Sequence, residues 1–201
     1  MGSIFAWPAL LALTLQALAI QAQAPPPAGR AQQPPAGPLV LGRRGTPPQP
    51  TPQQGVEYFV GSWTFTYTGR ESPISSGPRH GTMTFSRKGA GNVLDVLTEG
   101  QIEGGSPFKE TGTFAWSEAE KVMTITERLS NGTEVTTLGN WSSPITIRAE
   151  SRAVPAGGQS VRIRRVYSIL SAQSFTVAEE ISIDGGAFQR LGTGQFSKAP
   201  R

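Results

Sequence analysis

Two charged side chains interrupt apolar faces in the C-terminal third of the chain. Arg165 lies in the middle of one face of the alternating stretch 160–170, and Glu179 lies in the middle of one face of the stretch 174–183. A short turn at 171–174 would pair the two stretches antiparallel and place these side chains opposite each other. Because buried charges are rare unless they are paired, one hypothesis is an interior ion pair that orients the polar head group of a ligand.

The alternative interpretation turns Arg165 outward. A bulge within Arg162-Ile163-Arg164-Arg165 would shift the alternation by one residue, and Arg165 would then belong to a solvated face. Asp95 is a third charge on an apolar face, since it stands between Val93 and Leu97 in another predicted strand. The sequence alone leaves both interpretations of Arg165 open.

Aromatic side chains supply the apolar part of the candidate site. Three of them alternate along the stretch 57–68 and therefore share one face of the predicted strand. The candidate ligand-binding residues are these three aromatic residues and the three charged ones, namely Trp63, Phe65, Tyr67, Asp95, Arg165 and Glu179.

The sequence offers little for catalysis or metal binding. His80 is the only histidine, the chain has no cysteine, and it has no G-x-S-x-G motif. A catalytic triad needs a base beside a nucleophile, and many zinc sites need cysteine. His80 follows Pro78 in a predicted turn, where a solvated side chain is favoured over a metal ligand. We expect a protein that is not an enzyme and that holds no metal or cofactor.

The positive charge of the chain is unevenly distributed. The formal net charge is +4, and residues 25–54 contribute three arginines and no acid. All fourteen acidic residues lie in 55–201, together with fifteen Lys and Arg. The part that folds is therefore nearly neutral, whereas a nucleic-acid-binding domain concentrates positive charge on its folded face. We expect no nucleic-acid partner.

The first 54 residues predict export. Residues 4–20 form an apolar run, and Ala22-Gln23-Ala24 follows as a cleavage motif of small residues, so that 1–24 is predicted to be a signal peptide. An uncleaved anchor is the alternative. Residues 25–54 hold ten of the seventeen prolines and predict a disordered tether, with a PxxP-type ligand as its alternative. We expect a periplasmic or secreted protein without a stable membrane span after processing.

Residues 55–201 predict one all-β domain. Short alternating stretches are separated by Gly- and Pro-rich turns, a pattern typical of antiparallel sheets, and a short helix is expected near 52–59. A single closed up-and-down barrel is favoured over a two-sheet sandwich, because closure removes exposed edges. About ten strands are predicted from the alternation, near 57–68, 80–87, 93–101, 108–117, 121–129, 134–141, 145–153, 160–170, 174–183 and 188–197.

Two short motifs carry a resemblance to known proteins. Phe59-Val60-Gly61-Ser62-Trp63 resembles the F-x-G-x-W opening of the calycins, which include lipocalins and fatty-acid-binding proteins. With the terminal hairpin Ser182-Ile183-Asp184-Gly185-Gly186, the chain looks closer still to a bacterial family of unknown function with a calycin-like barrel. The resemblance covers roughly residues 57–197, the span of the alternating pattern.

The resemblance implies a structural signature at one end of the barrel. Gly61 would let the chain enter the first strand, and Trp63 would plug the barrel beneath a basic residue of the last strand. That residue would be Lys198, with Arg190 as the second choice, and the contact would be a cation–π interaction. Related haem-binding barrels use a histidine late in the chain, whereas His80 lies near the second predicted strand, so haem is not expected.

The leading functional hypothesis is a barrel that encloses a small apolar or amphipathic ligand. The alternative is a non-enzymatic interaction or structural module whose interior is filled by side chains. The two differ in the space that the inward side chains leave.

Overall fold

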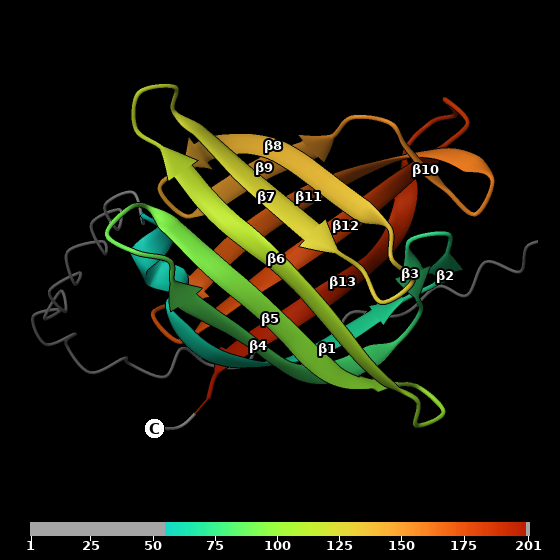
Figure 1. Cartoon of the computed structure of the whole chain (residues 1–201), viewed down its shortest axis with the longest axis horizontal. Helices are drawn as coiled ribbons and strands as arrows, with labels where there is room; N and C mark the ends of the chain where they lie inside the picture. The colour runs from blue at the N-terminus through green and yellow to red at the C-terminus, as the bar shows by residue number, and fades with distance from the viewer. Residues whose placement is uncertain (1–54, 200–201) are drawn as a thin grey trace, which may run out of the picture. The chain divides into compact units, whose positions relative to one another are not determined.

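Alternation of inward and outward side chains from Gly61 onward produces a closed antiparallel sheet (Figure 1). The computed structural model describes residues 55–199. The predicted signal peptide (1–24) and Pro-rich tether (25–54) lie outside the described residues. Within 55–199, no helix has the length and apolar character needed to cross a membrane.

Ten strands form the barrel wall, and each pairs antiparallel with the next wall strand along the chain. The circle closes where β13 pairs with β1. This confirms the predicted all-β closed barrel of about ten strands, and the sandwich alternative is wrong. The wall strands are β1 (Gly61–Gly69), β4 (Arg79–Arg87), β5 (Val93–Ile102), β6 (Pro107–Ser117), β7 (Val122–Arg128), β8 (Glu134–Ser143), β9 (Thr146–Ser151), β11 (Gln159–Ser171), β12 (Ser174–Ile183) and β13 (Gln189–Lys198).

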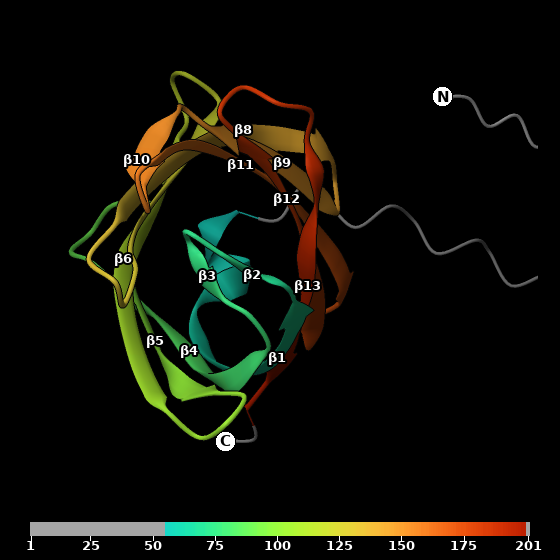
Figure 2. The same ribbon diagram turned by 90° about the vertical axis from the view of Figure 1, so that its right-hand side faces the viewer.

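Residues 55–199 also form four shorter elements. β2 (Glu71–Ser72) and β3 (Ser75–Ser76) form a small hairpin, and β10 (Val154–Ala156) extends the wall beside β11. The 3-10 helix η1 (Val56–Phe59) matches the short helix expected near 52–59. In Figure 2 the wall strands form a ring around η1 and the β2–β3 hairpin, and Figure 1 places these two at opposite ends of the barrel.

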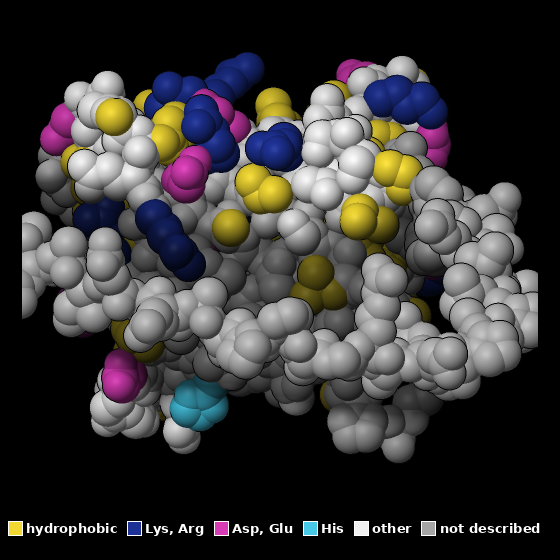
Figure 3. Space-filling model, turned by 180° about the vertical axis from the view of Figure 1, so that it is seen from behind, with side chains coloured by type: hydrophobic (Ala, Val, Ile, Leu, Met, Phe, Trp, Pro, Cys, Tyr) yellow, Lys and Arg dark blue, Asp and Glu magenta, His cyan; other side chains and the backbone are white. Residues whose placement is uncertain are grey.

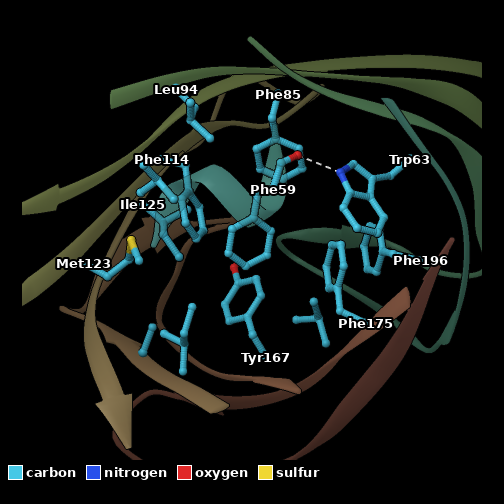
Figure 4. Packing of buried hydrophobic residues seen from close by; sticks show 14 of the residues in the cluster. Phe59, Trp63, Phe85, Leu94, Phe114, Met123, Ile125, Tyr167, Phe175 and Phe196 are labelled. Atoms are coloured by element: carbon cyan, nitrogen blue, oxygen red, sulfur yellow. Dashed lines mark hydrogen bonds between the residues drawn. The ribbon is translucent and has the colours of Figure 1, made fainter. Parts of the chain in front are cut away.

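Phe59 of η1 fills one end of the barrel. Its ring is fully buried, with its centroid 4.7 Å from that of Phe114 and 5.3 Å from that of Phe175. The indole N–H of Trp63 donates to the carbonyl oxygen of Phe59 over 2.7 Å, and the rings of Phe175 and Phe196 stack at 4.4 Å (Figure 4). Burying each apolar ring contributes roughly 1.5–3 kcal/mol, so these contacts hold η1 in the barrel as an aromatic plug.

Apolar side chains also close the opposite end. Ile74, between β2 and β3, is buried in a second cluster that includes Ile163 of β11 and Leu129, which directly follows β7. The side-chain amide of Asn131 donates to the carbonyl oxygen of Pro73 over 2.9 Å and fixes the hairpin to the loop between β7 and β8. The hairpin therefore covers this end through both apolar and polar contacts.

Candidate functional site

The interior ion pair predicted from the sequence is present. β11 and β12 pair so that Arg165 lies opposite Glu179, and Nε of Arg165 donates to Oε1 of Glu179 over 2.7 Å. The two side chains are only 6% and 10% exposed. The pairing of β11 with β12 shifts register only beyond Ile169, so no bulge turns Arg165 outward. The alternative placement of Arg165 on a solvated face is wrong.

Glu127 on β7 is a further partner of Arg165. Its carboxylate accepts a hydrogen bond from Nη1 of Arg165. β8 and β9 separate β7 from β11 in the wall, so this contact crosses the interior. Glu127 is not among the residues predicted from the sequence. Arg165 was identified as a charge on an apolar alternating face, and Glu127 has the same pattern. Glu127 interrupts the buried face formed by Met123, Ile125 and Leu129.

A second charged pair joins β4 and β6. Nη1 of Arg79 lies 3.6 Å from Oε1 of Glu110, and the side chains are 14% and 11% exposed. The guanidinium of Arg79 also lies over the rings of Tyr67 and Phe108, 5.1 and 5.4 Å from their centroids. The Arg79–Glu110 distance is longer than a hydrogen bond, so this pair interacts only by charge. Neither residue was among those predicted.

Burial and neighbouring charges shift the pKa values of these groups in different directions. Burial raises the pKa of Glu179, but the charges of Arg165 and Arg79 outweigh it and hold that pKa below its usual range. Burial also raises the pKa of Glu110; Arg79 offsets part of that effect, and the charge of Glu127 raises it further, so this pKa lies above its usual range. Glu110 is thus less well compensated than Glu179.

The guanidinium of Arg165 remains charged. Burial lowers its pKa, but the carboxylates of Glu127 and Glu179 raise it well above the ordinary value.

Two phenols accompany the charged groups. Tyr67 is 5% exposed, and its hydroxyl lies near Glu179 and Ser75 without a hydrogen bond of good geometry to either. Burial, aided by the charge of Glu179, raises the pKa of Tyr67 well above its ordinary value. Burial likewise raises the pKa of Tyr167, so both phenols are neutral near pH 7. Buried hydroxyls nearly always find a partner, and Glu179, Ser75, a water or a ligand in the cavity can supply one to Tyr67.

A cavity of about 70 Å³ lies among these groups. Its wall combines the charged side chains on β4, β6, β7, β11 and β12 with aromatic rings, among them Phe65, Phe114 and Phe175. It also includes Ile74 and Leu129 from the apolar cluster at the hairpin end. By volume the cavity holds roughly five water molecules. The wall is therefore apolar in part and charged in part.

Four of the six predicted ligand-binding residues line this cavity, namely Phe65, Tyr67, Arg165 and Glu179. Trp63 does not. It is fully buried in the aromatic plug, where its indole is hydrogen-bonded to the backbone of η1.

The prediction that Asp95 faces the interior is wrong. Its side chain is 52% exposed and lies 3.3 Å from the ammonium of Lys88. β5 directs its other face inward, and Val96 and Thr98 on that face line the cavity. Both faces of this strand carry apolar residues, so alternation alone did not identify the inner one.

The signature implied by the calycin resemblance is present. Lys198 is paired with Trp63 across β13 and β1, and its Nζ lies 5.1 Å from the centroid of the Trp63 ring. Gly61 has φ +115°, a conformation that favours glycine, and a Cβ there would lie 3.5 Å from Cε of Lys198. Arg190, the second choice, is exposed and donates to the hydroxyl of Thr193.

No cluster of metal-ligating side chains lies within residues 55–199. His80 is an exposed residue of β4, not a turn residue, and no group of three or more His, Cys, Asp or Glu side chains between residues 55 and 199 could hold a metal ion.

On the face shown in Figure 3, basic and acidic side chains are interspersed. Ion pairs between partly exposed side chains include Arg164–Glu150 at 3.0 Å.

Comparison with known proteins supports the fold. No protein-family model matches the chain, and no match to a curated protein was found. The crystal structure of Rv2717c from M. tuberculosis is similar with a TM-score of 0.57 and 16% identity, over 72% of this chain and 95% of that chain. A redesigned β-barrel, mFAP1, bound to DFHBI, gives a TM-score of 0.40 and 18% identity, over 72% of this chain and 98% of that chain. The similarity to Rv2717c supports the closed β-barrel and shows the fold alone.

Proposed function

We propose that this protein is an exported, non-enzymatic barrel that binds one small amphipathic molecule in its interior, in the periplasm or outside the cell. The apolar part of the ligand contacts the aromatic rings of the cavity wall. The polar part meets the charged side chains and the hydroxyl of Tyr67.

The observation that carries this proposal is an interior cavity whose wall joins aromatic rings to charged side chains and to the buried hydroxyl of Tyr67. Leaving a buried hydroxyl without a partner costs roughly 1–3 kcal/mol, and native proteins rarely accept that cost. A molecule in the cavity that hydrogen-bonds to this hydroxyl removes the cost. The apolar remainder of the wall favours an occupant that also has an apolar part.

The size of the cavity limits the ligand. About 70 Å³ is well below the roughly 300–1,000 Å³ of sites for drug-sized molecules. The aromatic plug fills the space towards η1 that a longer chain would need. These dimensions support a compact ligand rather than a lipid.

Binding is favoured over catalysis because the cavity lacks a pair of groups suited to it. The hydroxyl-bearing residues in the described wall are Thr98, Thr113, Tyr67 and Tyr167, and no histidine accompanies them. Two of the carboxylates, those of Glu127 and Glu179, are bound to Arg165. Neither is free to act as a general base, so Glu110 is the one carboxylate of the described wall that could move a proton, and it has no second free carboxylate or histidine beside it.

The test is to look for a bound molecule and then to block the cavity. The protein, purified without denaturation from the cell envelope of its own host, is examined by native mass spectrometry and by thermal shift against a panel of small amphipathic molecules. We expect an adduct or a ligand-dependent rise in Tm. Val96→Phe places a larger side chain in the cavity wall and should abolish both the adduct and the rise in Tm. Leu97→Phe, at the next and outward-facing position, should leave both unchanged.

A bare protein mass with no thermal shift across the panel contradicts the proposal. That result would favour the alternative, in which water alone occupies the cavity and the outer surface carries the function. A signal that persists unchanged in Val96→Phe would place the ligand elsewhere.

A further inference from the structure

The cavity wall carries one more carboxylate than guanidinium. Its charged side chains are those of Arg79, Arg165, Glu110, Glu127 and Glu179, so three acids face two bases. The guanidinium of Arg165 binds two of the carboxylates. The carboxylates therefore outnumber the guanidiniums, and the formal charge of the wall with every group ionised is −1.

Glu110 is the carboxylate with the least compensation. Its only ion-pair partner among the described residues is Arg79, at 3.6 Å. Glu127 is paired across the sheet with Gly112, so Glu110 and Glu127 are diagonal neighbours on the inner face of β6 and β7. Two carboxylates at this spacing repel each other, and the raised pKa of Glu110 reflects both its burial and this repulsion. A cation beside them would relieve the repulsion.

Other features of the wall also suit a cation. The buried hydroxyl oxygen of Tyr67 lines the cavity and has lone pairs that can accept a hydrogen bond even when its proton is directed to Glu179. Tyr67 and Tyr167 also present aromatic rings to the cavity, and aromatic faces attract ammonium groups. An anionic ligand would instead add a second uncompensated negative charge, because the two guanidiniums of the wall already face three carboxylates.

We infer that the ligand is a small primary amine, bound as its ammonium ion beside Glu110 and Glu127 with its alkyl part towards the aromatic rings. This inference rests on the proposed function and names the chemical class of its ligand. A cavity with room for roughly five water molecules limits the ligand to a short chain. The ammonium donates hydrogen bonds to carboxylate oxygens and to the hydroxyl oxygen of Tyr67.

The test compares three molecules of equal chain length that differ in charge: n-pentylamine, 1-pentanol and pentanoate. Affinity for the full mature protein is measured by isothermal titration calorimetry at pH 7. We expect n-pentylamine to bind at least tenfold more tightly than 1-pentanol, and pentanoate to show no binding.

Two variants separate charge from shape. Glu110→Gln keeps the side-chain volume and removes the charge, so it should lower the affinity for n-pentylamine at least tenfold and leave that for 1-pentanol unchanged. Retained binding of 1-pentanol also shows that the cavity of the variant is intact. Glu99→Gln is the matched control, because Glu99 is exposed and pairs with Lys109 on the outside of the barrel. Its affinities should equal those of the parent protein.

Acid should weaken amine binding selectively. As the pH falls, Glu110 takes up a proton before an ordinary carboxyl does and loses its attraction for the ammonium. The affinity for n-pentylamine should fall, and that for 1-pentanol should not. The titratable and charged groups that share the cavity with Glu110 are Arg79 on β4, Glu127 on β7, Arg165 and Tyr167 on β11, Glu179 on β12 and Tyr67 on β1.

The outcomes distinguish the inference from the function on which it rests. Equal affinities for n-pentylamine and 1-pentanol overturn the selection for a cation and leave a ligand-binding barrel. If none of the three binds while the native mass spectrum shows an adduct, the inference that the ligand is an amine is overturned and the proposed function stands. If no molecule binds and no adduct is seen, both are overturned.

Discussion

Arg165 and Glu127 meet across the interior of the barrel, although β8 and β9 separate their strands in the wall. Arg165 also binds Glu179 on the neighbouring strand β12. One guanidinium therefore neutralises two carboxylates that approach it from different sides. This arrangement makes Arg165 the group on which the interior charges depend.

Removing Arg165 should be far more damaging than removing an exposed arginine. Arg165→Met leaves the carboxylates of Glu127 and Glu179 without their partner, and breaking a buried ion pair in this way costs roughly 3–5 kcal/mol. The free energy of unfolding, measured with urea, should fall by about that amount. Arg148→Met, at an exposed position on β9, should change it by less than about 1 kcal/mol.

The same reasoning predicts a rescue. When Arg165→Met is combined with Glu127→Gln and Glu179→Gln, no uncompensated carboxylate remains in the network, and a large part of the lost stability should return. A triple variant as unstable as Arg165→Met alone would show that packing around the guanidinium, rather than charge, accounts for the loss.

The contribution of Glu179 should depend on pH. Its pKa is lower in the folded protein than the usual carboxyl value of about 4.3, so the ionised form stabilises the fold above that value. This stabilisation is lost as the pH falls through the lowered pKa. The difference in unfolding free energy between the parent protein and Glu179→Gln should be constant near pH 7 and shrink below about pH 4. Urea unfolding at several pH values measures it, and a difference that grows in acid would contradict the assignment.

The sequence predicted the strands and the pairing of Arg165 with Glu179 for the same reason. Both depend on local alternation and on a short turn, which link residues close together in the chain. Glu127 escaped prediction because its contact with Arg165 depends on how the whole sheet curves and closes. Asp95 was misplaced because β5 is apolar on both faces, and only the closed barrel determines which face is inward.

The β2–β3 hairpin was also beyond the reach of the sequence pattern. Its strands contain two residues each, too few to show an alternation. Its position is set by long-range contacts, namely the burial of Ile74 and the hydrogen bond from Asn131 to Pro73. The closure of that end of the cavity was therefore unpredicted, whereas the plug at the other end followed from Trp63 and the calycin resemblance.

The contact of Lys198 with Trp63 should contribute modestly to stability. Lys198→Met keeps most of the aliphatic stem and removes the charge, so the lost cation–π interaction should lower the unfolding free energy by about 0.5–1 kcal/mol. Lys198→Arg retains a cation over the ring and should lose less. Urea unfolding of the three proteins measures this order, and equal stability of Lys198→Met and the parent protein would show that the contact contributes nothing.

Tyr67 owes its position to a glycine on the neighbouring strand. A Cβ added at Gly192 would lie 2.3 Å from the hydroxyl oxygen of Tyr67 and 2.7 Å from the backbone oxygen of Thr68. Gly192→Ala must therefore displace the phenol, and overpacking of this kind costs roughly 1–3 kcal/mol. Gly91→Ala is the control, because an added Cβ there has open space around it and should change stability by less than about 0.5 kcal/mol.

The displacement of the ring can be separated from the backbone clash by a double-mutant cycle. In a protein that carries Tyr67→Ala, the contact with the phenol is gone and only that with Thr68 remains, so Gly192→Ala should be less destabilising there than in the parent protein. Because Tyr67 also lines the cavity, Gly192→Ala should weaken ligand binding as well as folding. If Gly192→Ala lowers the free energy of unfolding no more than Gly91→Ala does, the position of the Tyr67 ring does not depend on Gly192.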